Sequence, residues 1–298
     1  MIMSGNKKRT EDKLYPEIVH TVRMLNDDVH SFLRQHGLWL NTDRGQHFLV
    51  DEETLAEILS AAALKPQDHV VEIGPGIGVL TRELLKCAEK VTAIEIDERL
   101  IPLLHKFLDQ TPSLKPKTLN LTAVHGNALH TPMPTEAYKV VANIPYHITS
   151  PLLRHFFLES TLRPSSLTLL LQREVAENIC SEKSDSILTV LVRLFGEPHL
   201  VCLVPKEAFF PPPEVDSAVL HIDCFPSPLA DKETTERILN LAKLAFSQRR
   251  KMLSNSIGHT PGGSDALQKC GIDPKRRPET LSIDEWIRLE QAVNNTQA

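Results

Sequence analysis

The sequence predicts an α/β protein with a doubly wound sheet, followed by a small all-α domain. Two observations support this fold class. Apolar runs of strand length alternate with helical periodicity over residues 69–171, and from residue 232 onward only helical periodicity remains. We therefore divide the chain into a first region at 1–44 with one amphipathic helix, a sheet domain at 45–226, and a helical domain at 227–298.

The first region carries one helical stripe, which begins after residue 15. Its apolar residues are Ile18, Val22, Leu25, Val29 and Phe32. Their spacing of three or four positions places them on one face of a helix. We expect this face to pack on the sheet domain of the same chain, and a dimer contact is the alternative. A second helix is expected from its N-cap at Asp51 to Ala63.

The sheet domain shows a repeated pattern of strand and helix. Strands are expected at 69–73, 91–94, 119–124, 140–142 and 167–171, and helices at 79–87, 101–110 and 151–158. This succession predicts parallel strands joined by right-handed crossovers. Two later strands, at 201–204 and 218–222, are expected to pair as a hairpin at the sheet edge, joined by a proline-rich loop.

Composition limits the kinds of protein that the chain can be. A net charge of −5 argues against a surface that binds nucleic acid throughout, and no apolar stretch reaches the roughly 20 residues of a membrane span. The polar N-terminus lacks the apolar segment of a secretory signal, so we expect a cytoplasmic protein. The five cysteines are too scattered for a disulfide framework, and no metal-binding or serine-hydrolase motif occurs.

A glycine-rich turn follows the first expected strand. A side chain at Gly74, Gly76 or Gly78 would hold the backbone away from a ligand lying across the turn. A dinucleotide site would need its third glycine at Val79, so NAD and FAD are disfavoured. Glu95 ends the next strand, where a carboxylate can accept both hydroxyls of a ribose. The turn could be a plain βα connection, but with this acid it favours a ribose ligand without a pyrophosphate, such as S-adenosylmethionine.

A second polar turn follows the fourth expected strand, at Asn143, Ile144, Pro145 and Tyr146. The amino group of adenine is a poor nucleophile because its lone pair is delocalised into the ring. The Asn143 side-chain oxygen and the Ile144 carbonyl could bind its two N–H groups, and Tyr146 offers a surface for stacking. The turn is thus interpreted as a site for a methyl-accepting amine, with an ordinary type I turn as the alternative.

Basic residues gather near the C-terminus. Eight basic residues and two acidic ones lie between Lys243 and Arg277, a local balance of +6, and three of the basic residues are consecutive at 249–251. This asymmetry is typical of a surface that binds phosphates, and a solvated helix face is the alternative.

Five stretches carry a resemblance to a known family. They lie at 45–49 (GQHFL), 72–78 (EIGPGIG), 143–146 (NIPY), 204–219 and 246–251 (FSQRRK). Together they resemble the bacterial small-subunit rRNA (adenine-N6,N6) dimethyltransferases of the kasugamycin-sensitivity type, with the macrolide-resistance rRNA methylases as cousins. The last two stretches favour the small-subunit branch.

The resemblance implies a Rossmann-like class I methyltransferase fold with S-adenosylmethionine as cofactor. It implies that Gln46 and Phe48 lie over the methionine end of the cofactor and that Glu72 lies near its amino group. The remaining cofactor-binding residues that it implies are Gly74, Gly76, Glu95, Asn127 and Asn143.

The resemblance also implies how RNA is held. The target adenine would be bound by Asn143, Pro145 and Tyr146, with Phe209 stacked on its other face. The rRNA phosphates would be contacted by Arg249, Arg250 and Lys251. Such contacts add affinity without reading sequence.

Three departures from the family pattern stand out. His47 and Asn127 occupy positions where the family usually has Asn and Asp, and the segment 186–190 lacks the family's arginine. The family's Asp accepts from the adenine amine of the cofactor. We expect Asn127 to accept through its carbonyl oxygen instead.

The implied function is dimethylation of N6 of two adjacent adenines in a small-subunit (16S) rRNA hairpin during ribosome biogenesis. The partner would be small-subunit rRNA or the pre-30S particle, and we expect a monomer that uses no metal. Two alternatives stay open. One is an RNA-binding assembly factor with little or no catalysis, and the other is a large-subunit rRNA adenine methylase of the macrolide-resistance type.

Overall fold

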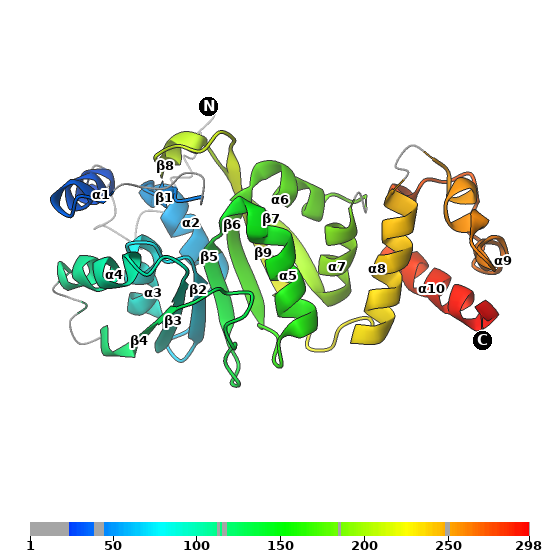
Figure 1. The fold of residues 1–298 in the computed structure, drawn as a ribbon, viewed down its shortest axis with the longest axis horizontal. Helices are drawn as coiled ribbons and strands as arrows, with labels where there is room; N and C mark the ends of the chain where they lie inside the picture. The colour runs from blue at the N-terminus through cyan, green and yellow to red at the C-terminus, as the bar shows by residue number, and fades with distance from the viewer. Residues whose placement is uncertain are drawn as a thin grey trace, which may run out of the picture.

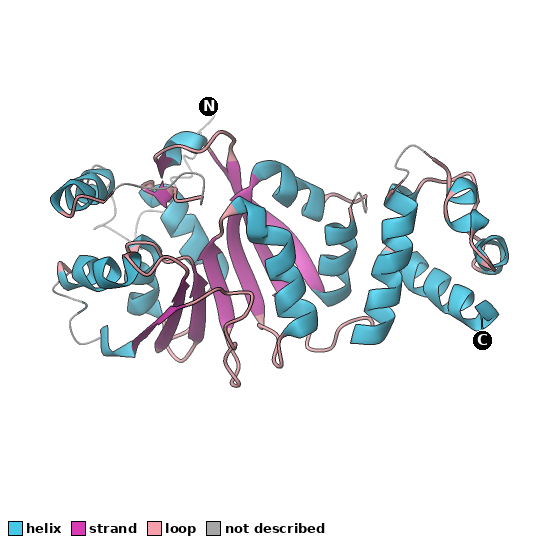
Figure 2. Cartoon of the chain, in the orientation of Figure 1, coloured by secondary structure: helices cyan, strands magenta, loops and turns pink. Residues whose placement is uncertain are grey.

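The fold is built around one large sheet that lies between two layers of helices. The computed structural model describes residues 24–38, 45–111, 114, 118–183, 186–247 and 251–297. Figure 1 shows the sheet near the middle of the molecule and the C-terminal helices at one end. Figure 2 shows helices on both faces of the sheet, as a doubly wound fold requires.

The sheet has seven strands in the order β4-β3-β2-β5-β6-β9-β7. The strands are β2 (His69–Ile73), β3 (Lys90–Glu95), β4 (Leu121–His125), β5 (Lys139–Asn143), β6 (Ser166–Gln172), β7 (Gly196–Val204) and β9 (Ser217–Cys224). The pairs from β4 to β6 are parallel, whereas β9 pairs antiparallel with both β6 and β7. The predicted parallel sheet and its edge hairpin are therefore confirmed.

The start of β4 differs from the prediction. Residues Thr118–Asn120 form a short 3-10 turn, and the strand begins only at Leu121. Leu119 is 88% exposed, so an apolar residue that suggested a strand has no place in the core. The apolar run was thus a misleading signal for the strand's first residues.

The two faces of the sheet bury different helices. One face is covered by α2 (Glu52–Ala62), α3 (Val79–Cys87) and α4 (Leu100–Asp109). The other is covered by α5 (Thr149–Arg154), its π-helical extension His155–Glu159, α6 (Arg173–Cys180) and α7 (Ile187–Phe195). Alternate residues of a strand face opposite layers, so Val70 belongs to the first cluster and Val71 to the second. The sequence had predicted neither α6 nor α7.

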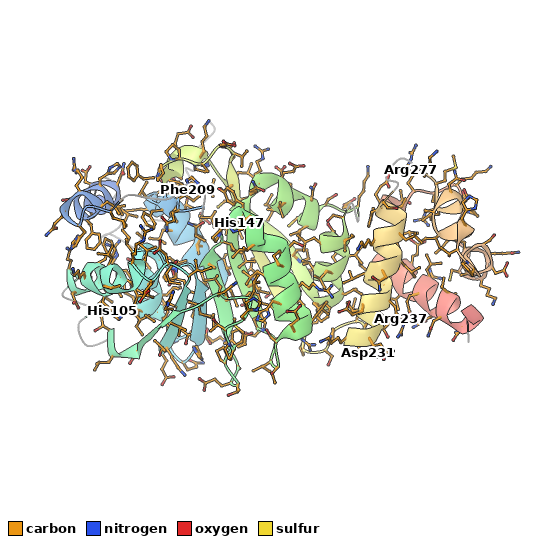
Figure 3. All side chains as sticks on the ribbon, viewed as in Figure 1. His105, His147, Phe209, Asp231, Arg237 and Arg277 are labelled. Atoms are coloured by element: carbon orange, nitrogen blue, oxygen red, sulfur yellow. The ribbon has the colours of Figure 1, made fainter. Side chains whose placement is uncertain are left out.

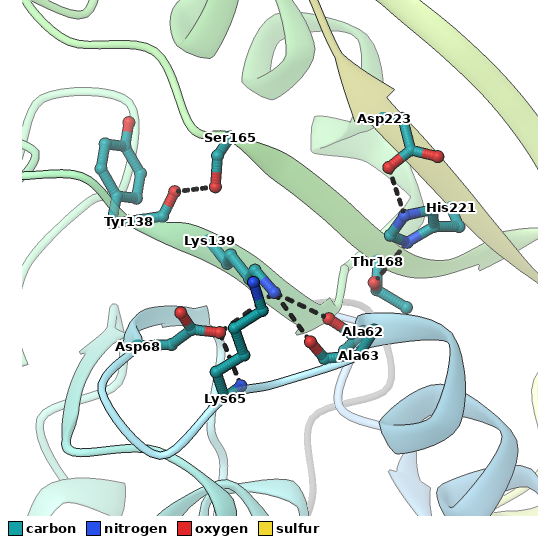
Figure 4. Close-up of polar contacts among 10 residues, drawn as sticks. All are labelled: Ala62, Ala63, Lys65, Asp68, Tyr138, Lys139, Ser165, Thr168, His221 and Asp223. Carbon is teal, nitrogen blue, oxygen red and sulfur yellow. Dashed lines mark hydrogen bonds and ion pairs between the residues drawn. The ribbon is translucent and has the colours of Figure 1, made fainter.

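Helix α2 begins as predicted. The Asp51 carboxylate accepts from the backbone N–H of Thr54 at 2.8 Å, which satisfies one of the free donors at the helix start. At the other end of this helix, Lys139 of β5 donates to the carbonyl oxygens of Ala62 and Ala63 and pairs with Asp68 at 3.0 Å (Figure 4). These contacts lie where β5 begins, so the carboxyl ends of the strands are left for a ligand.

Helix α1 (Met24–Gln35) packs on the α2–α4 side of the sheet domain. Leu25, Val29 and Phe32 of the predicted stripe are all buried, and Phe32 meets Phe107 of α4 edge to face at 5.2 Å. The stripe therefore packs on the sheet domain of the same chain, as expected. Ile18 and Val22 lie outside the described residues.

The C-terminal region is helical, with α8 (Lys232–Phe246), α9 (Gly263–Lys269) and α10 (Ile283–Gln297), and no strand occurs in its described part. Trp286 is fully buried at its centre and packs against Phe246. Apolar residues of these helices form one continuous cluster with those of α5, α7 and the sheet. Arg154 of α5 also pairs with Glu236 of α8 at 2.6 Å.

Candidate active site

A cavity of about 550 Å³ opens at the carboxyl ends of β2, β3, β4 and β5. Its position is the one at which open α/β sheets bind ligands. All eight candidate cofactor residues line it. They are Gln46, Phe48, Glu72, Gly74, Gly76, Glu95, Asn127 and Asn143. Ile96 and His147, which the sequence analysis did not select, also line this cavity.

Glycine is needed in this turn for different structural reasons at different positions. All three have positive φ, at 68°, 60° and 101° for Gly74, Gly76 and Gly78. A Cβ on Gly76 would lie 2.5 Å from the Phe48 ring, and a Cβ on Gly78 would lie 2.4 Å from Leu104 of α4. Gly78 does not line the cavity, so its expected role in leaving space for a ligand was wrong. Glycine is needed at position 78 because it lets Leu104 of α4 pack closely against the turn.

Two buried carboxyl groups, Glu72 and Glu95, face the cavity from neighbouring strands. Glu95 accepts the backbone N–H groups of Gly76 and Asp97 at 3.0 and 2.9 Å. Glu72 accepts a hydrogen bond from the Thr81 hydroxyl at 2.6 Å. Burial raises the pKa of Glu72 to about 8 and also raises the pKa of Glu95. Desolvated acids of this kind suit a cationic ligand that restores their charge.

A third acid, Asp97, was missed in the sequence analysis. It is buried, and it accepts from the Gln46 amide at 2.9 Å. Hydrogen bonds from Arg99 hold its pKa well below the usual range. The only sequence signal was a second acid two positions after Glu95. Asp97 thus attaches the 45–49 segment to the wall that carries Glu95.

A second, smaller pocket adjoins the cavity and contains all four candidate catalytic residues. It is lined by Gly45, His47, Asn143, Ile144, Pro145, Tyr146 and Phe209. The first cavity shares four of these residues, namely Gly45, His47, Asn143 and Pro145. The volume of about 10 Å³ admits about one water molecule.

Hydrogen bonds orient two side chains of this pocket. The Asn143 Nδ2 group donates to the His47 backbone carbonyl at 3.1 Å, which turns its Oδ1 to the opposite side. The Tyr146 hydroxyl bonds to Ser217 of β9 at 2.7 Å. Asn143 therefore offers the small pocket a hydrogen-bond acceptor, and Tyr146 offers it an aromatic ring.

Two distant segments meet over the pocket. Strand β1 (Phe48–Leu49) pairs antiparallel with β8 (Phe209–Phe210), and this small ladder had not been predicted. The His47 ring adds a bond from Nδ1–H to the Pro211 carbonyl at 2.8 Å. In Figure 3, Phe209 and His147 lie on the upper side of the sheet.

Asn127 lines the cavity from the turn after β4. Its Oδ1 atom accepts from the Leu129 N–H at 3.0 Å. One of the two acceptor positions on this oxygen is therefore already used within the turn.

The basic cluster is described only in part. Arg249 and Arg250 lie outside the described residues, whereas Lys251 is exposed. A backbone bond from Leu253 to Arg276 brings this segment beside residues 275–277. Arg276 pairs with Glu285, and Arg277 is exposed. In Figure 3, Arg277 lies on the upper side of the molecule, as does the buried Phe209.

Two further properties bear on function. Across the described ranges, no three acidic, histidine or cysteine side chains are arranged to hold a metal ion. Each helix in those ranges falls short of the length and apolar character that crossing a bilayer needs.

The sheet order and the cavity at its carboxyl edge define a Rossmann-like methyltransferase fold. The chain belongs to the ribosomal RNA adenine dimethylase family, whose model matches residues 38–295. The fold class and the family resemblance expected from the sequence are therefore confirmed.

Curated relatives and solved structures agree with this assignment. The chain is 43% identical to a ribosomal RNA small subunit methyltransferase A of Dehalococcoides mccartyi over 82% of this chain and 85% of that protein. It is 37% identical to the protein of the same name from Shouchella clausii, over 91% and 98%. A dimethyladenosine transferase structure from Plasmodium falciparum is 28% identical, with a TM-score of 0.68, covering 83% of this chain and 97% of that one. The structure of the 23S rRNA methyltransferase ErmE is 30% identical, with a TM-score of 0.65, covering 83% and 99%.

Proposed function

We propose that this protein is an S-adenosylmethionine-dependent enzyme that dimethylates N6 of adenines in small-subunit rRNA. The observation that carries the proposal is the junction of the two pockets, where Asn143 lines both. A donor in the large cavity and an acceptor amine in the small one would meet at this residue. Membership of the rRNA adenine dimethylase family supports the same reaction.

The large cavity fits S-adenosylmethionine through the charge of its walls. Glu95, at the end of β3, would accept the ribose hydroxyls, and Glu72 would face the amino group. Gln46 and Phe48 would cover the methionine end, while Gly74 and Gly76 allow the backbone to approach. Asn127 and Asn143 would complete the walls around the adenine and the methyl group. When bound, the cofactor supplies a methyl group on a sulfonium.

The small pocket would position the acceptor amine. The Asn143 Oδ1 atom and the Ile144 carbonyl would accept its two N–H groups, which returns the nitrogen lone pair to the direction of the methyl group. Tyr146 and Phe209 would hold the adenine ring between them, with Pro145 fixing the turn. The proton of the amine leaves to water, so the protein contributes positioning and charge complementarity.

The RNA would be a small-subunit hairpin with two adjacent adenines, either free or within a pre-30S particle. Adenines in a loop are already partly unstacked, which lowers the cost of entering the pocket. Lys251, with Arg249 and Arg250, would bind phosphates beside the exposed Arg277. We further propose that the enzyme acts as a monomer in the cytoplasm.

Methyl transfer to purified ribosomal particles tests this function. The full chain is incubated with labelled S-adenosylmethionine and with unmethylated 30S or 50S particles. We expect label in 30S RNA, recovered as N6,N6-dimethyladenosine. Label in 50S RNA would support the macrolide-resistance type instead. Absence of both labelling and calorimetric cofactor binding at millimolar concentration would support a non-catalytic assembly factor.

A further inference from the structure

His47 contacts both sides of the acceptor pocket. Its backbone carbonyl accepts from the Asn143 amide at 3.1 Å, and its ring donates to the Pro211 carbonyl at 2.8 Å. Pro211 lies 164 positions away in the chain and directly follows the β8 strand that carries Phe209. One residue therefore joins the amine-binding side of the pocket to the segment that covers it.

The covering segment, residues 205–211, has few other attachments to the 45–50 segment. Two residue pairs join β1 and β8, and the Val50 N–H bonds to the Ala208 carbonyl at 2.8 Å. On its outer side, the ring of Phe210 packs against His30 of α1 with centroids 3.7 Å apart. The His47 ring supplies a side-chain hydrogen bond at the end of this short ladder, next to Phe209.

We propose that His47 is a positioning residue for the target adenine, and this inference rests on the proposed function. Through its carbonyl it keeps the Asn143 oxygen turned toward the amine. Through its ring it holds residues 209–211, so that Phe209 returns to the same place each time a base enters and leaves. The feature of the side chain that this role requires is an N–H donor at the Nδ1 position.

The chain offers a matched pair of variants for this donor. An asparagine at position 47 can place its amide N–H where Nδ1–H lies, whereas a leucine of similar size has no donor. Both variants keep the backbone carbonyl that orients Asn143. Any difference between His47→Asn and His47→Leu therefore reports the bond to Pro211 and not the volume of the side chain.

Steady-state methylation of 30S particles by both variants is the first measurement. For His47→Leu we expect kcat/KM to fall about tenfold, because the Pro211 carbonyl loses its partner. For His47→Asn we expect kcat/KM within about twofold of the wild type. The calorimetric Kd for S-adenosylmethionine should agree within about twofold between the two variants, since both lose the same ring beside the cofactor cavity and Gln46 is held by Asp97 in each.

Amide hydrogen exchange of the unliganded protein is the second measurement, and it does not depend on activity. We expect faster exchange over residues 206–210 in His47→Leu than in His47→Asn or the wild type. Equal exchange and equal kcat/KM in the two variants would overturn the inference. A wild type that exchanges as expected but transfers no methyl group would refute the proposed function alone. If His47→Leu does not fold, His47→Ala provides the variant without a donor.

Discussion

The proposed cofactor half and the proposed acceptor half of the site are built in different ways. The cofactor cavity of about 550 Å³ is formed mainly by turns that follow four adjacent strands, each shaped by its own residues. The acceptor pocket of about 10 Å³ is formed by segments near residues 47, 145 and 209, which only the tertiary fold brings together. The first half therefore already has room for a ligand, whereas the second half has room for about one water molecule.

This difference explains where rigidity and movement are expected. Gly74 and Gly76 adopt backbone conformations that leave the cavity open without any rearrangement. Phe209, by contrast, is buried, and Tyr146 is held by Ser217, so the pocket between them is nearly filled. Entry of the proposed adenine would displace part of the cover over the pocket. Variants in the two halves should then affect different steps.

The largest expected effect is that of a change at Asn143, which is one of the four residues that line both pockets. Asn143→Ala removes the acceptor for the amine, and we expect methyl transfer to fall by at least about 100-fold because a positioned hydrogen bond to the reacting group is lost. Cofactor affinity should change by only a few fold. Labelled methyl incorporation and calorimetry measure the two quantities. A parallel loss of both would mean that Asn143 belongs mainly to the cofactor half.

A second variant tests how tightly the cofactor half is packed. Gly76→Ala places a methyl group 2.5 Å from the Phe48 ring and also forces alanine into a left-handed conformation. We expect cofactor affinity to fall by about tenfold or more, since roughly 1.4 kcal/mol already corresponds to that change.

Gly271→Ala is the matched control for Gly76→Ala. Gly271 has a similar φ of 66° but no atom within 4 Å of the added Cβ. We expect it to lower stability by about 1–2 kcal/mol while leaving cofactor affinity unchanged. Calorimetric Kd and thermal unfolding of both variants give the comparison. Equal cofactor affinity in the two variants would contradict a specific role for the Phe48 contact.

The smallest expected effect depends on pH. The folded pKa of Glu72, about 8, lies above its ordinary value of 4.5. Its contribution to stability is therefore complete below about pH 4.5 and is lost as the pH rises toward 8. A cationic cofactor group gains from the ionised form, while neutral Glu72 can still accept a hydrogen bond from it through its carbonyl oxygen, so we expect cofactor affinity to increase by only a few fold between about pH 6 and 8.

Glu72→Gln should flatten both pH dependences, because it removes the titrating group. Glu174→Gln, at an exposed position on α6, is the control and should leave them unchanged. Isothermal titration and urea unfolding across this pH range provide the measurements. A steep dependence that persists in Glu72→Gln would assign the titration to Glu95, whose pKa burial also raises.

Much of the cofactor half could be predicted because its signals are local. The bounds of β2 and α3 agree with the prediction, and Asp51 caps α2 as expected. Each depends on residues that are close in the chain, such as an apolar run, a glycine turn or a capping side chain. The residues expected around the cofactor line one cavity for the same reason, since parallel strands bring their carboxyl ends together.

The acceptor half shows where local signals stop. Nothing near His47 in the sequence indicates that its ring meets Pro211. The cofactor half has one contact of the same kind, since nothing near Gln46 indicates Asp97. The β1–β8 ladder has only two residues in each strand, too few for a periodic pattern. These contacts form because the packed sheet domain brings segments that are far apart in the chain to one place.

The amino-acid sequence by itself determined the order of the strands along the chain, the turn at Gly74–Gly78 and the acids and amide that follow the strands. Backbone sterics and side-chain periodicity act over a few residues, so they can be read from neighbouring positions. Only the tertiary structure decided that Phe209 and Asn143 line one pocket and that His47 bonds to both Asn143 and Pro211. The two His47 bonds span 96 and 164 positions, and their free energy depends on the whole core that holds these segments in place.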